Sequence, residues 1–292
     1  MSELAAAVER VWPGRGARFE LLGGGITNHN ANVELDDEVY VLRVAGKDTD
    51  LLGIDRTVEH DATVAAAALG IGPEVVAFIE PEGWLVTRFI AGEPIPIERM
   101  REPENLDRVA SALRAVHLGP PVSGRFDSFR VVERYLETAL SRGGAEPDRY
   151  SWARDIARKI ESIRARDEPR LCHNDLLNAN FIDDGERIRI VDWEYAGMGD
   201  RFFDLANFAI NHELEPDERE SLLRAYSGAV GREDMRALEL MRFMSDFREA
   251  MWGTVQTVVS ELDFDFAGYA AEHFGRLERT SAEPTFQRAL GA

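Results

Sequence analysis

The sequence predicts an α+β fold of two lobes, a small β-rich N-terminal lobe and a larger, mostly helical C-terminal lobe. Up to residue 90 the chain shows short runs of alternating or β-branched residues bounded by turn residues, which is typical of strands. Beyond Gly92-Glu93-Pro94 the apolar residues recur mostly at helical spacing. This change of pattern predicts a lobe of residues 1–92 and a lobe of residues 93–292. Ligands favour the crevice between two such lobes.

The N-terminal lobe is expected to contain five strands and one helix. The glycine turn at 23–25 and the Asp36-Asp37 turn separate the first three strands. The helix carries apolar residues at helical spacing and ends at Gly70. The predicted strands cover residues 18–22, 28–35, 38–45, 75–79 and 84–89, and the predicted helix covers residues 54–69.

Helical patterns dominate the C-terminal lobe, with one interruption of strands and loops over residues 170–195. Within this insert two short apolar strands, near 180–182 and 188–191, flank an Asp-Asp-Gly turn. The predicted helices cover residues 102–118, 131–142, 151–166, 202–212, 216–229, 233–259 and 266–279.

The composition excludes several classes of protein. A net charge of −19 argues against sequence-independent binding of nucleic acid and against docking on anionic lipid, since both need a basic surface. No run reaches the roughly 18 apolar residues of a membrane span, and the first residues lack the pattern of a signal peptide. The one cysteine, Cys172, cannot form an internal disulfide, and we interpret it as a small buried side chain. We therefore expect a cytoplasmic protein, and the sequence indicates no oligomeric state.

The insert carries the residues that point to chemistry. His173, Asp175 and Asn180 stand as H-x-D-x-x-x-x-N before the first of its strands, and Asp192 ends the second strand. Phosphoryl transfer from ATP needs a carboxylate that accepts the proton of the acceptor hydroxyl, and an Asn and an Asp that hold magnesium. The order and spacing supply all three. The alternative is a polar loop, because Asn and Asp also form ordinary turns.

The segments HNDLLNANFI, VDWEYAG and FDLANF, with GGGITNHN and YVLRV upstream, resemble the choline/ethanolamine kinase family. This family is a branch of the aminoglycoside phosphotransferases within the protein-kinase-like superfamily, and the resemblance covers nearly the whole chain. It implies a bilobal protein-kinase-like fold, ATP and Mg²⁺ as cofactors, Asp175 as catalytic base, and Asn180 and Asp192 as metal ligands. It also implies that His173 braces the loop. Asp204, which opens the FDLANF helix, suits either a helix N-cap or a brace beneath the catalytic loop.

The glycine-rich segment of the N-terminal lobe is the candidate phosphate site. Gly24, Gly25, Thr27 and Asn28 lie between two predicted strands, and glycine lets the backbone approach phosphates closely. The alternative is an ordinary hairpin, which is the usual meaning of such a turn on its own.

The strand after this turn supplies further nucleotide candidates. A period of two places Val41 and Arg43 on one face. The resemblance implies that Val41 packs on adenine, that Arg43 reaches the phosphates, and that Glu59 on the following helix forms an ion pair with Arg43. Phe89 and Ile90, leading into the linker, would offer backbone groups to the adenine edge. The alternative is an exposed arginine on an edge strand and a solvated glutamate, whose pairing contributes little energy.

The acceptor pocket is expected beside Asp175, on the helix over residues 233–259. An apolar stripe on this helix faces the core, and a second row one residue round contains Glu249 and Trp252 among polar residues. The ring of Trp252 is therefore expected beside the core and available to a ligand. An aromatic face next to an acid binds a quaternary ammonium through cation–π attraction. The alternative is an ordinary packing aromatic.

The resemblance supplies the other acceptor candidates. Choline kinases have a Trp-Gly pair on the equivalent helix and a tyrosine soon after, which Trp252 and Tyr269 match. Glu194 and Tyr195 follow the metal-binding strand and are further candidates, and the acidic residue of the family on the FDLANF helix falls at Asn211. The second tryptophan of eukaryotic choline kinases is a valine here. The less complete cage makes ethanolamine or another amino alcohol an acceptor candidate beside choline.

These expectations converge on an ATP- and Mg²⁺-dependent kinase that phosphorylates the hydroxyl of choline or ethanolamine, a small cationic amino alcohol. Two alternatives stay open. One is a kinase of an aminoglycoside or amino sugar on the same scaffold, since fold does not settle substrate. The other is a nucleotide-binding pseudoenzyme with a regulatory role, against which the intact Asp175, Asn180 and Asp192 speak.

Overall fold

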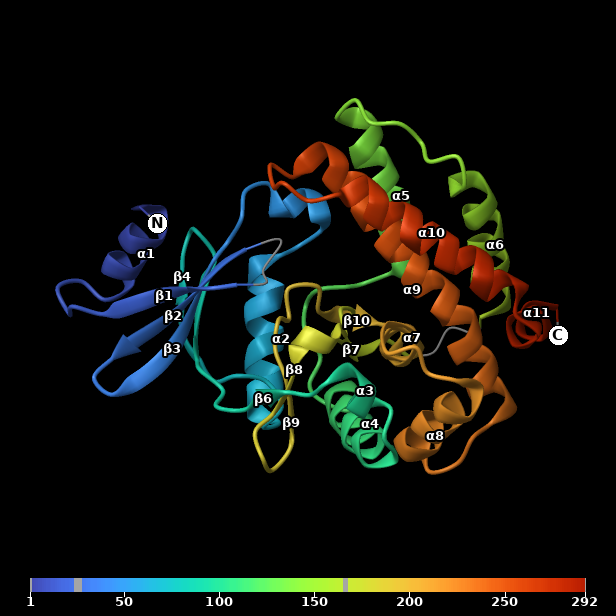
Figure 1. The fold of residues 1–292 in the computed structure, drawn as a ribbon, viewed down its shortest axis with the longest axis horizontal. Helices are drawn as coiled ribbons and strands as arrows, with labels where there is room; N and C mark the ends of the chain where they lie inside the picture. The colour runs from blue at the N-terminus through green and yellow to red at the C-terminus, as the bar shows by residue number, and fades with distance from the viewer. Residues whose placement is uncertain (1, 24–27, 165–167, 292) are drawn as a thin grey trace.

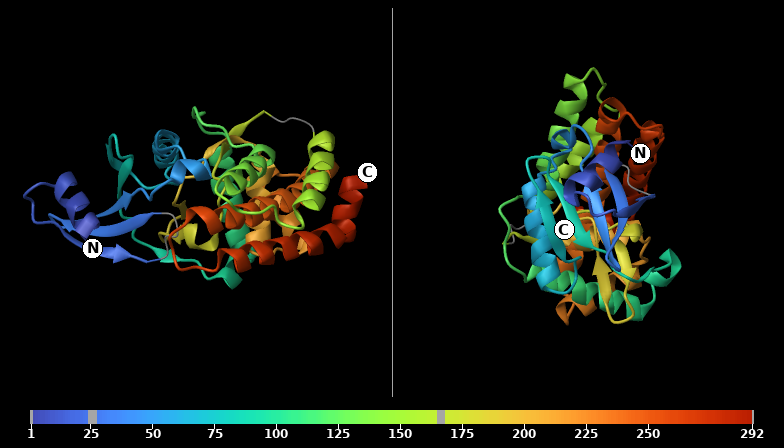
Figure 2. Two further views of the ribbon diagram at one scale, coloured as in Figure 1. Left: turned by 90° about the horizontal axis from the view of Figure 1, so that it is seen from above. Right: turned by 90° about the vertical axis from the view of Figure 1, so that its left-hand side faces the viewer.

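The computed structural model describes residues 2–23, 28–164 and 168–291. It consists of a β-sheet region near the N-terminus and a larger, mostly helical region that contains the C-terminus (Figure 1). The view from above shows these two regions side by side along the long axis (Figure 2). The α+β fold class expected from the sequence is confirmed. Within the described ranges, no helix is both long and apolar enough to span a membrane.

The N-terminal region is built on one antiparallel sheet and one long helix. The strands are β1 (Arg18–Leu22), β2 (His29–Leu35), β3 (Glu38–Val44), β4 (Val75–Ile79) and β5 (Trp84–Arg88), and the helices are η1 (Thr49–Leu52) and α2 (Arg56–Ala68). The strand order is β1-β2-β3-β5-β4, and α2 packs against β4. Along β3, Tyr40, Leu42 and Val44 are buried, whereas Val41 and Arg43 face the other side, as the period of two predicts.

Helix α1 (Ser2–Val11) packs against this sheet and was not among the predicted elements. Its Leu4, Ala7 and Val8 belong to the same buried apolar cluster as Val33 and Leu42 of the sheet. The spacing of these residues is helical, but an isolated helix of 10 residues is only marginally stable. Packing on the sheet therefore stabilises α1, and that packing is not visible in a local pattern.

Nine helices make up most of the C-terminal region within the described residues. They are α3 (Ile97–Met100), α4 (Pro103–His117), α5 (Ser128–Ser141), α6 (Tyr150–Ile163), α7 (Arg201–Asn211), α8 (Pro216–Ser227), α9 (Arg232–Val259), α10 (Phe266–Ala282) and α11 (Pro284–Gly291). Helix α9 contacts α5, α7, α10 and α11 (Figure 1). Because helices cover it on several sides, every residue from Ala237 to Gln256 is buried, including the charged ones.

Short strands shape the insert between α6 and α7. They are β7 (Arg170–Cys172), β8 (Phe181–Asp183), β9 (Ile188–Ile190) and β10 (Gly197–Gly199), and the short helix η2 (Asn178–Asn180) precedes β8. β7 pairs with β10, whereas β8 pairs with both β9 and β6 (Glu93–Pro94). The predicted strands match β8 and β9. β6, β7 and β10 were not predicted: β8 and β9, which are equally short, are marked by the Asp-Asp-Gly turn between them, whereas the partners of β6, β7 and β10 lie far away in the sequence.

The chain crosses from one region to the other between β5 and β6. Because β6 pairs with β8, Glu93 already lies in a sheet of the C-terminal region. Gly92 passes so close to this sheet that a Cβ there would lie 2.5 Å from the carbonyl oxygen of Asp183, which only glycine avoids. On these contacts we propose the boundary between residues 92 and 93.

Candidate active site

The loop between β7 and β8 is held from beneath by Asp204 of α7. The carboxylate of Asp204 accepts hydrogen bonds from the backbone N–H of His173 at 2.8 Å and of Asn174 at 2.7 Å. The N-cap of α7 is Asp200, which accepts from the N–H of Phe202 at 2.9 Å. Of the two roles open to Asp204 from the sequence, the geometry therefore shows the brace.

His173 fixes the loop to the strand that follows it. Its side chain is completely buried, and its Nε2 donates to the carbonyl oxygen of Val191 at 2.9 Å. Its Nδ1 then accepts from the backbone N–H of Asp175 at 3.2 Å, which requires the Nε2–H tautomer. Both ring nitrogens are engaged in holding the backbone, as the structural interpretation of His173 predicts.

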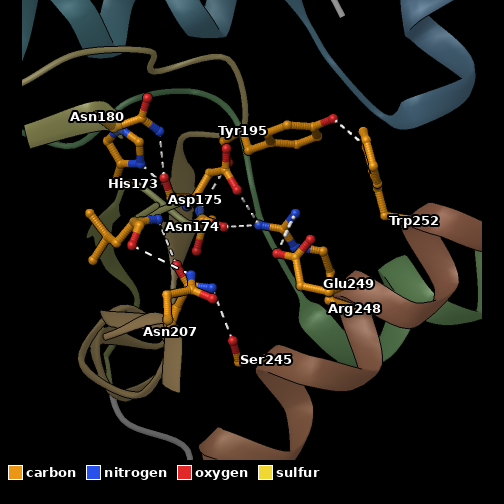
Figure 3. Close-up of polar contacts among 12 residues, drawn as sticks. His173, Asn174, Asp175, Asn180, Tyr195, Asn207, Ser245, Arg248, Glu249 and Trp252 are labelled. Carbon is orange, nitrogen blue, oxygen red and sulfur yellow. Dashed lines mark hydrogen bonds and ion pairs between the residues drawn. The ribbon is translucent and has the colours of Figure 1, made fainter. Parts of the chain in front are cut away.

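Asp175 lies at the centre of a network of polar contacts (Figure 3). Its carboxylate Oδ1 lies 3.0 Å from a guanidinium nitrogen of Arg248, and its backbone carbonyl accepts from Nδ2 of Asn180 at 2.8 Å. Burial raises the pKa of Asp175 to about 7; Arg248 opposes the rise, and the carboxylates of Glu249 and Asp192 add to it. A carboxylate with a pKa near neutrality is well suited to accept a proton as a general base.

A cavity of about 300 Å³ lies between the N-terminal sheet and the insert. It brings together six of the predicted site residues, namely Val41, Arg43, Phe89, Ile90, Asn180 and Asp192. β3, the segment after β5 and the catalytic loop each contribute to its wall. Candidates for adenine, phosphate and metal binding that lie far apart in the sequence therefore share one cavity.

Ion pairs hold the charged side chains of Arg43 and Asp192 in the wall of this cavity. Arg43 forms the expected ion pair with Glu59 of α2, and it also lies 2.9 Å from Asp192. Arg56, at the start of α2, contacts the other oxygen of Glu59 at 2.6 Å. The side chains of Arg43, Arg56 and Glu59 are at most 13% exposed. The alternative of a solvated pair on an edge strand is therefore wrong, since β3 is also an interior strand.

Asn28 and Glu194 link the two regions beside these ion pairs. Nδ2 of Asn28 donates to Glu194 Oε2 at 2.7 Å, and Arg56 lies 3.3 Å from the same oxygen. Burial raises the pKa of Glu194 to about 7, with Asp192 adding to the rise and Arg43 opposing it. Glu194 thus lies with the nucleotide candidates and its contacts run to the N-terminal region. The candidates Gly24, Gly25 and Thr27 lie outside the described residues.

Four of the acceptor candidates lie together on the other side of Asp175. Nε1 of Trp252 donates to the hydroxyl oxygen of Tyr195 at 2.9 Å, and the hydroxyl of Tyr269 donates to Glu249 Oε2 at 2.8 Å. The rings of Trp252 and Tyr269 meet edge to face with centroids 5.5 Å apart. We call Tyr195, Glu249, Trp252 and Tyr269 the aromatic–acid cluster. Another of the acceptor candidates, Asn211, donates to the carbonyl of Leu176 at 3.4 Å.

The expectation that Trp252 lies beside the core, with its ring available, is wrong for this structure. The residue is 7% exposed, and Phe266 packs against its ring at a centroid distance of 5.8 Å. The physical reason is that α10 covers this side of α9, so the polar row of the helix is as buried as its apolar stripe. A ligand can therefore meet at most an edge or part of this ring.

Sequence reasoning missed Arg248, which is 1% exposed. Besides Asp175 it contacts the carbonyl of Asn174 and lies 3.0 Å from Glu249, and its guanidinium lies 5.1 Å from the ring centroid of Tyr195. A signal was present. Arg248 and Glu249 are adjacent opposite charges that stand between Phe247 and Ala250, next to the predicted core stripe, where unpaired charges are rare.

Asn207 of α7 was also missed. Its Oδ1 accepts from the N–H of Leu176 at 2.6 Å, and its Nδ2 donates to Ser245 of α9 at 2.9 Å. It ties the catalytic loop to α9 (Figure 3).

A model of the phosphotransferase enzyme family matches residues 18–240 of this chain. The chain belongs to the phosphotransferase enzyme family. Among curated proteins, this phosphotransferase is 25% identical over 258 residues to protein LicA of Haemophilus influenzae, covering 84% of this chain and 75% of LicA. It is 26% identical over 299 residues to ethanolamine kinase 2 of Homo sapiens, covering 91% of this chain and 76% of that kinase.

Solved structures give the same assignment. A choline/ethanolamine kinase family protein from Mesorhizobium loti superposes with a TM-score of 0.83 at 30% identity, covering 100% of this phosphotransferase and 98% of that chain. Aminoglycoside 2'-phosphotransferase-IIIa shares the fold at a TM-score of 0.68 and 14% identity, covering 96% and 98%. The resemblance to choline/ethanolamine kinases and the protein-kinase-like fold are thus confirmed. This phosphotransferase is a small-molecule kinase with an alcohol group as acceptor.

Proposed function

We propose that this phosphotransferase transfers the γ-phosphoryl group of ATP, with magnesium, to the hydroxyl of choline or ethanolamine. One observation carries the proposal: Asp175 joins the nucleotide side to the acceptor side of the site. Its backbone bonds to Asn180, which lines the cavity, and its carboxylate meets Arg248 on the helix that also carries Glu249 and Trp252. An in-line transfer needs the base beside the acceptor hydroxyl, at the place where the acceptor meets the nucleotide.

Asn180 and Asp192 fit a magnesium ion. Both line the cavity, and carboxylate and amide oxygens are the protein ligands that Mg²⁺ takes. The Nδ2 atom of Asn180 is engaged by the carbonyl of Asp175, so its amide oxygen is left to accept a cation. Asp192 Oδ1 pairs with Arg43, which leaves its second oxygen. Bound there, magnesium would neutralise charge on the phosphates.

Each of the other site residues has a separate role in the proposed phosphoryl transfer. Arg43, held by Glu59, offers a fixed positive charge to the phosphates, while Val41 supports the adenine. Asp175 orients the acceptor hydroxyl and takes its proton. The buried ion pairs and the brace from Asp204 keep these groups in place, so little reorganisation is needed at the moment of transfer.

The aromatic–acid cluster supports a cationic acceptor. Tyrosine and tryptophan rings attract an ammonium group, and the carboxylate of Glu249 adds negative charge beside them. The names of two similar proteins, ethanolamine kinase 2 and a choline/ethanolamine kinase family protein, agree with this acceptor class. A cytoplasmic location stays a prediction that rests on the single cysteine of the sequence.

A turnover screen tests the proposed function. Purified protein with ATP and magnesium is given choline, ethanolamine, an amino sugar or an aminoglycoside, and ADP release is compared with a reaction that lacks an acceptor. We expect kcat/KM for choline or ethanolamine to exceed the values for the other two by about tenfold or more. Faster turnover of the amino sugar or the aminoglycoside would replace the proposed acceptor, and no turnover above background would refute the proposed function.

A further inference from the structure

A buried arginine, Arg248, lies beside the carboxylate of Asp175 on the acceptor side of the site. The guanidinium of Arg248 lies 3.0 Å from Asp175 Oδ1 and 3.0 Å from Glu249, and it also donates to the carbonyl of Asn174 (Figure 3). These contacts fix it in one position, and the side chain is 1% exposed. A permanent positive charge is thus built in next to the proposed base.

This charge matters because the proposed acceptor has two different ends. An amino alcohol carries a hydroxyl and an ammonium group, and a bare buried carboxylate attracts the ammonium more strongly than the hydroxyl. An ammonium bound to Asp175 would place the hydroxyl away from the nucleotide, which is unproductive. A cation already paired with that carboxylate repels a second one and still leaves an oxygen that can accept a hydroxyl proton.

The same guanidinium also occupies one aromatic surface. It lies 5.1 Å from the ring centroid of Tyr195, within the range of a cation–π contact. The contact involves Tyr195, whereas Trp252, four residues further along α9, and Tyr269 of α10 form the other end of the aromatic–acid cluster. The ammonium of an acceptor is therefore directed there, with its hydroxyl toward Asp175.

We infer that Arg248 is a positioning residue that sets the direction in which the amino alcohol binds. It excludes the ammonium group from Asp175 and so reserves the base for the hydroxyl. The inference rests on the proposed function, because it needs an acceptor with both groups.

Ethylamine, which has the ammonium but lacks the hydroxyl, is the probe. Its inhibition constant against ethanolamine is measured for wild type, Arg248→Met and Arg248→Lys at saturating ATP and magnesium. In Arg248→Met the base is open to the ammonium, so we expect ethylamine to inhibit about tenfold more strongly while kcat falls about tenfold. Arg248→Lys, which keeps the charge, should return the inhibition constant close to wild type. A purely structural role would weaken binding of every ligand instead.

Arg242→Met is the matched control. Arg242 lies on the same helix and is also buried, and it pairs with Glu239 and Glu283 away from the site. Loss of the Arg242 side chain should lower the melting temperature and leave the inhibition constant of ethylamine unchanged. If Arg248→Met does not fold, Arg248→Gln replaces it, because glutamine keeps N–H donors without the charge.

The outcomes separate the two claims. Wild type that turns over no amino alcohol overturns the proposed function and this inference with it. Turnover by wild type, combined with an unchanged or weaker ethylamine inhibition in the uncharged variant, overturns the inference alone. If neither uncharged variant folds, binding of ethylamine and of ethanolamine to wild type is compared instead. Ethylamine should then bind at least about tenfold more weakly than ethanolamine, and equal binding overturns the inference.

Discussion

Replacing Trp252 tests whether its ring contributes to the acceptor site or only to packing. The ring is 7% exposed, packs edge to face on Phe266 and Tyr269, and donates one hydrogen bond to Tyr195. Two variants separate these contributions. Trp252→Phe keeps an aromatic face and loses the N–H donor, whereas Trp252→Leu keeps only apolar volume.

The contacts set the size of each effect. Loss of the hydrogen bond to Tyr195 costs about 1 kcal/mol of the free energy of unfolding in both variants. Because a ligand can meet at most an edge or part of this ring, a partial cation–π contact of about 1 kcal/mol corresponds to a roughly fivefold rise in KM for choline or ethanolamine in Trp252→Leu. Trp252→Phe should raise this KM only about threefold, because a phenyl face attracts a cation less strongly than an indole face. KM for ATP should stay unchanged, since Trp252 does not line the nucleotide cavity.

Steady-state kinetics for both substrates are measured beside thermal melting. Trp152→Leu serves as the control: Trp152 lies on α6, packs edge to face on Phe243, and contacts none of the aromatic–acid cluster through that ring. It should lower the melting temperature and leave both KM values unchanged. The same result for Trp252→Leu, lower stability with an unaltered KM for the amino alcohol, would refute a role of the ring in binding the acceptor.

Two further predictions concern the metal ligands and a buried histidine. Asp192→Asn should weaken binding of ATP in the presence of magnesium on the order of tenfold, and calorimetry in EDTA should show no such loss; an unchanged magnesium titration would move the metal site elsewhere. Burial lowers the pKa of His212 to about 4, so protonation favours the unfolded chain, and the free energy of unfolding should fall by about 3 kcal/mol from pH 7 to pH 4 through this group. In urea unfolding, the free energy of unfolding of His212→Asn should change with pH by this amount less than that of wild type. An equal pH dependence in variant and wild type would contradict the lowered pKa of His212.

The sequence predicts most of the elements that surround the nucleotide cavity. β3 shows why: from Val39 to Val44 partly exposed and buried residues alternate, and this period of two places Val41 and Arg43 on the wall of the cavity. The catalytic loop was found because its residues lie close together in the chain, so spacing alone describes them. Sequence patterns predict an element or a site correctly where its residues lie close together in the chain.

Contacts between distant segments could not be predicted in this way. The burial of Trp252 depends on α10, which returns along α9 and covers it. Glu194 and Tyr195 are adjacent in the sequence, yet the first contacts Asn28 and the second contacts Trp252, because successive side chains leave the backbone in different directions. Arg248 contacts Asp175 only because the fold packs the catalytic loop against α9.

The most direct test of the central claim is the product formed by wild type and by Asp175→Asn. With ATP, magnesium and choline or ethanolamine, phosphorus NMR should show wild type forming the phosphomonoester of the amino alcohol together with ADP. Asp175→Asn should bind ATP as wild type does and form the product about 10²- to 10⁴-fold more slowly, which is the usual contribution of a general base. A near wild-type rate in Asp175→Asn would contradict the assignment of the base, and ADP without a phosphomonoester in wild type would contradict phosphoryl transfer to the alcohol.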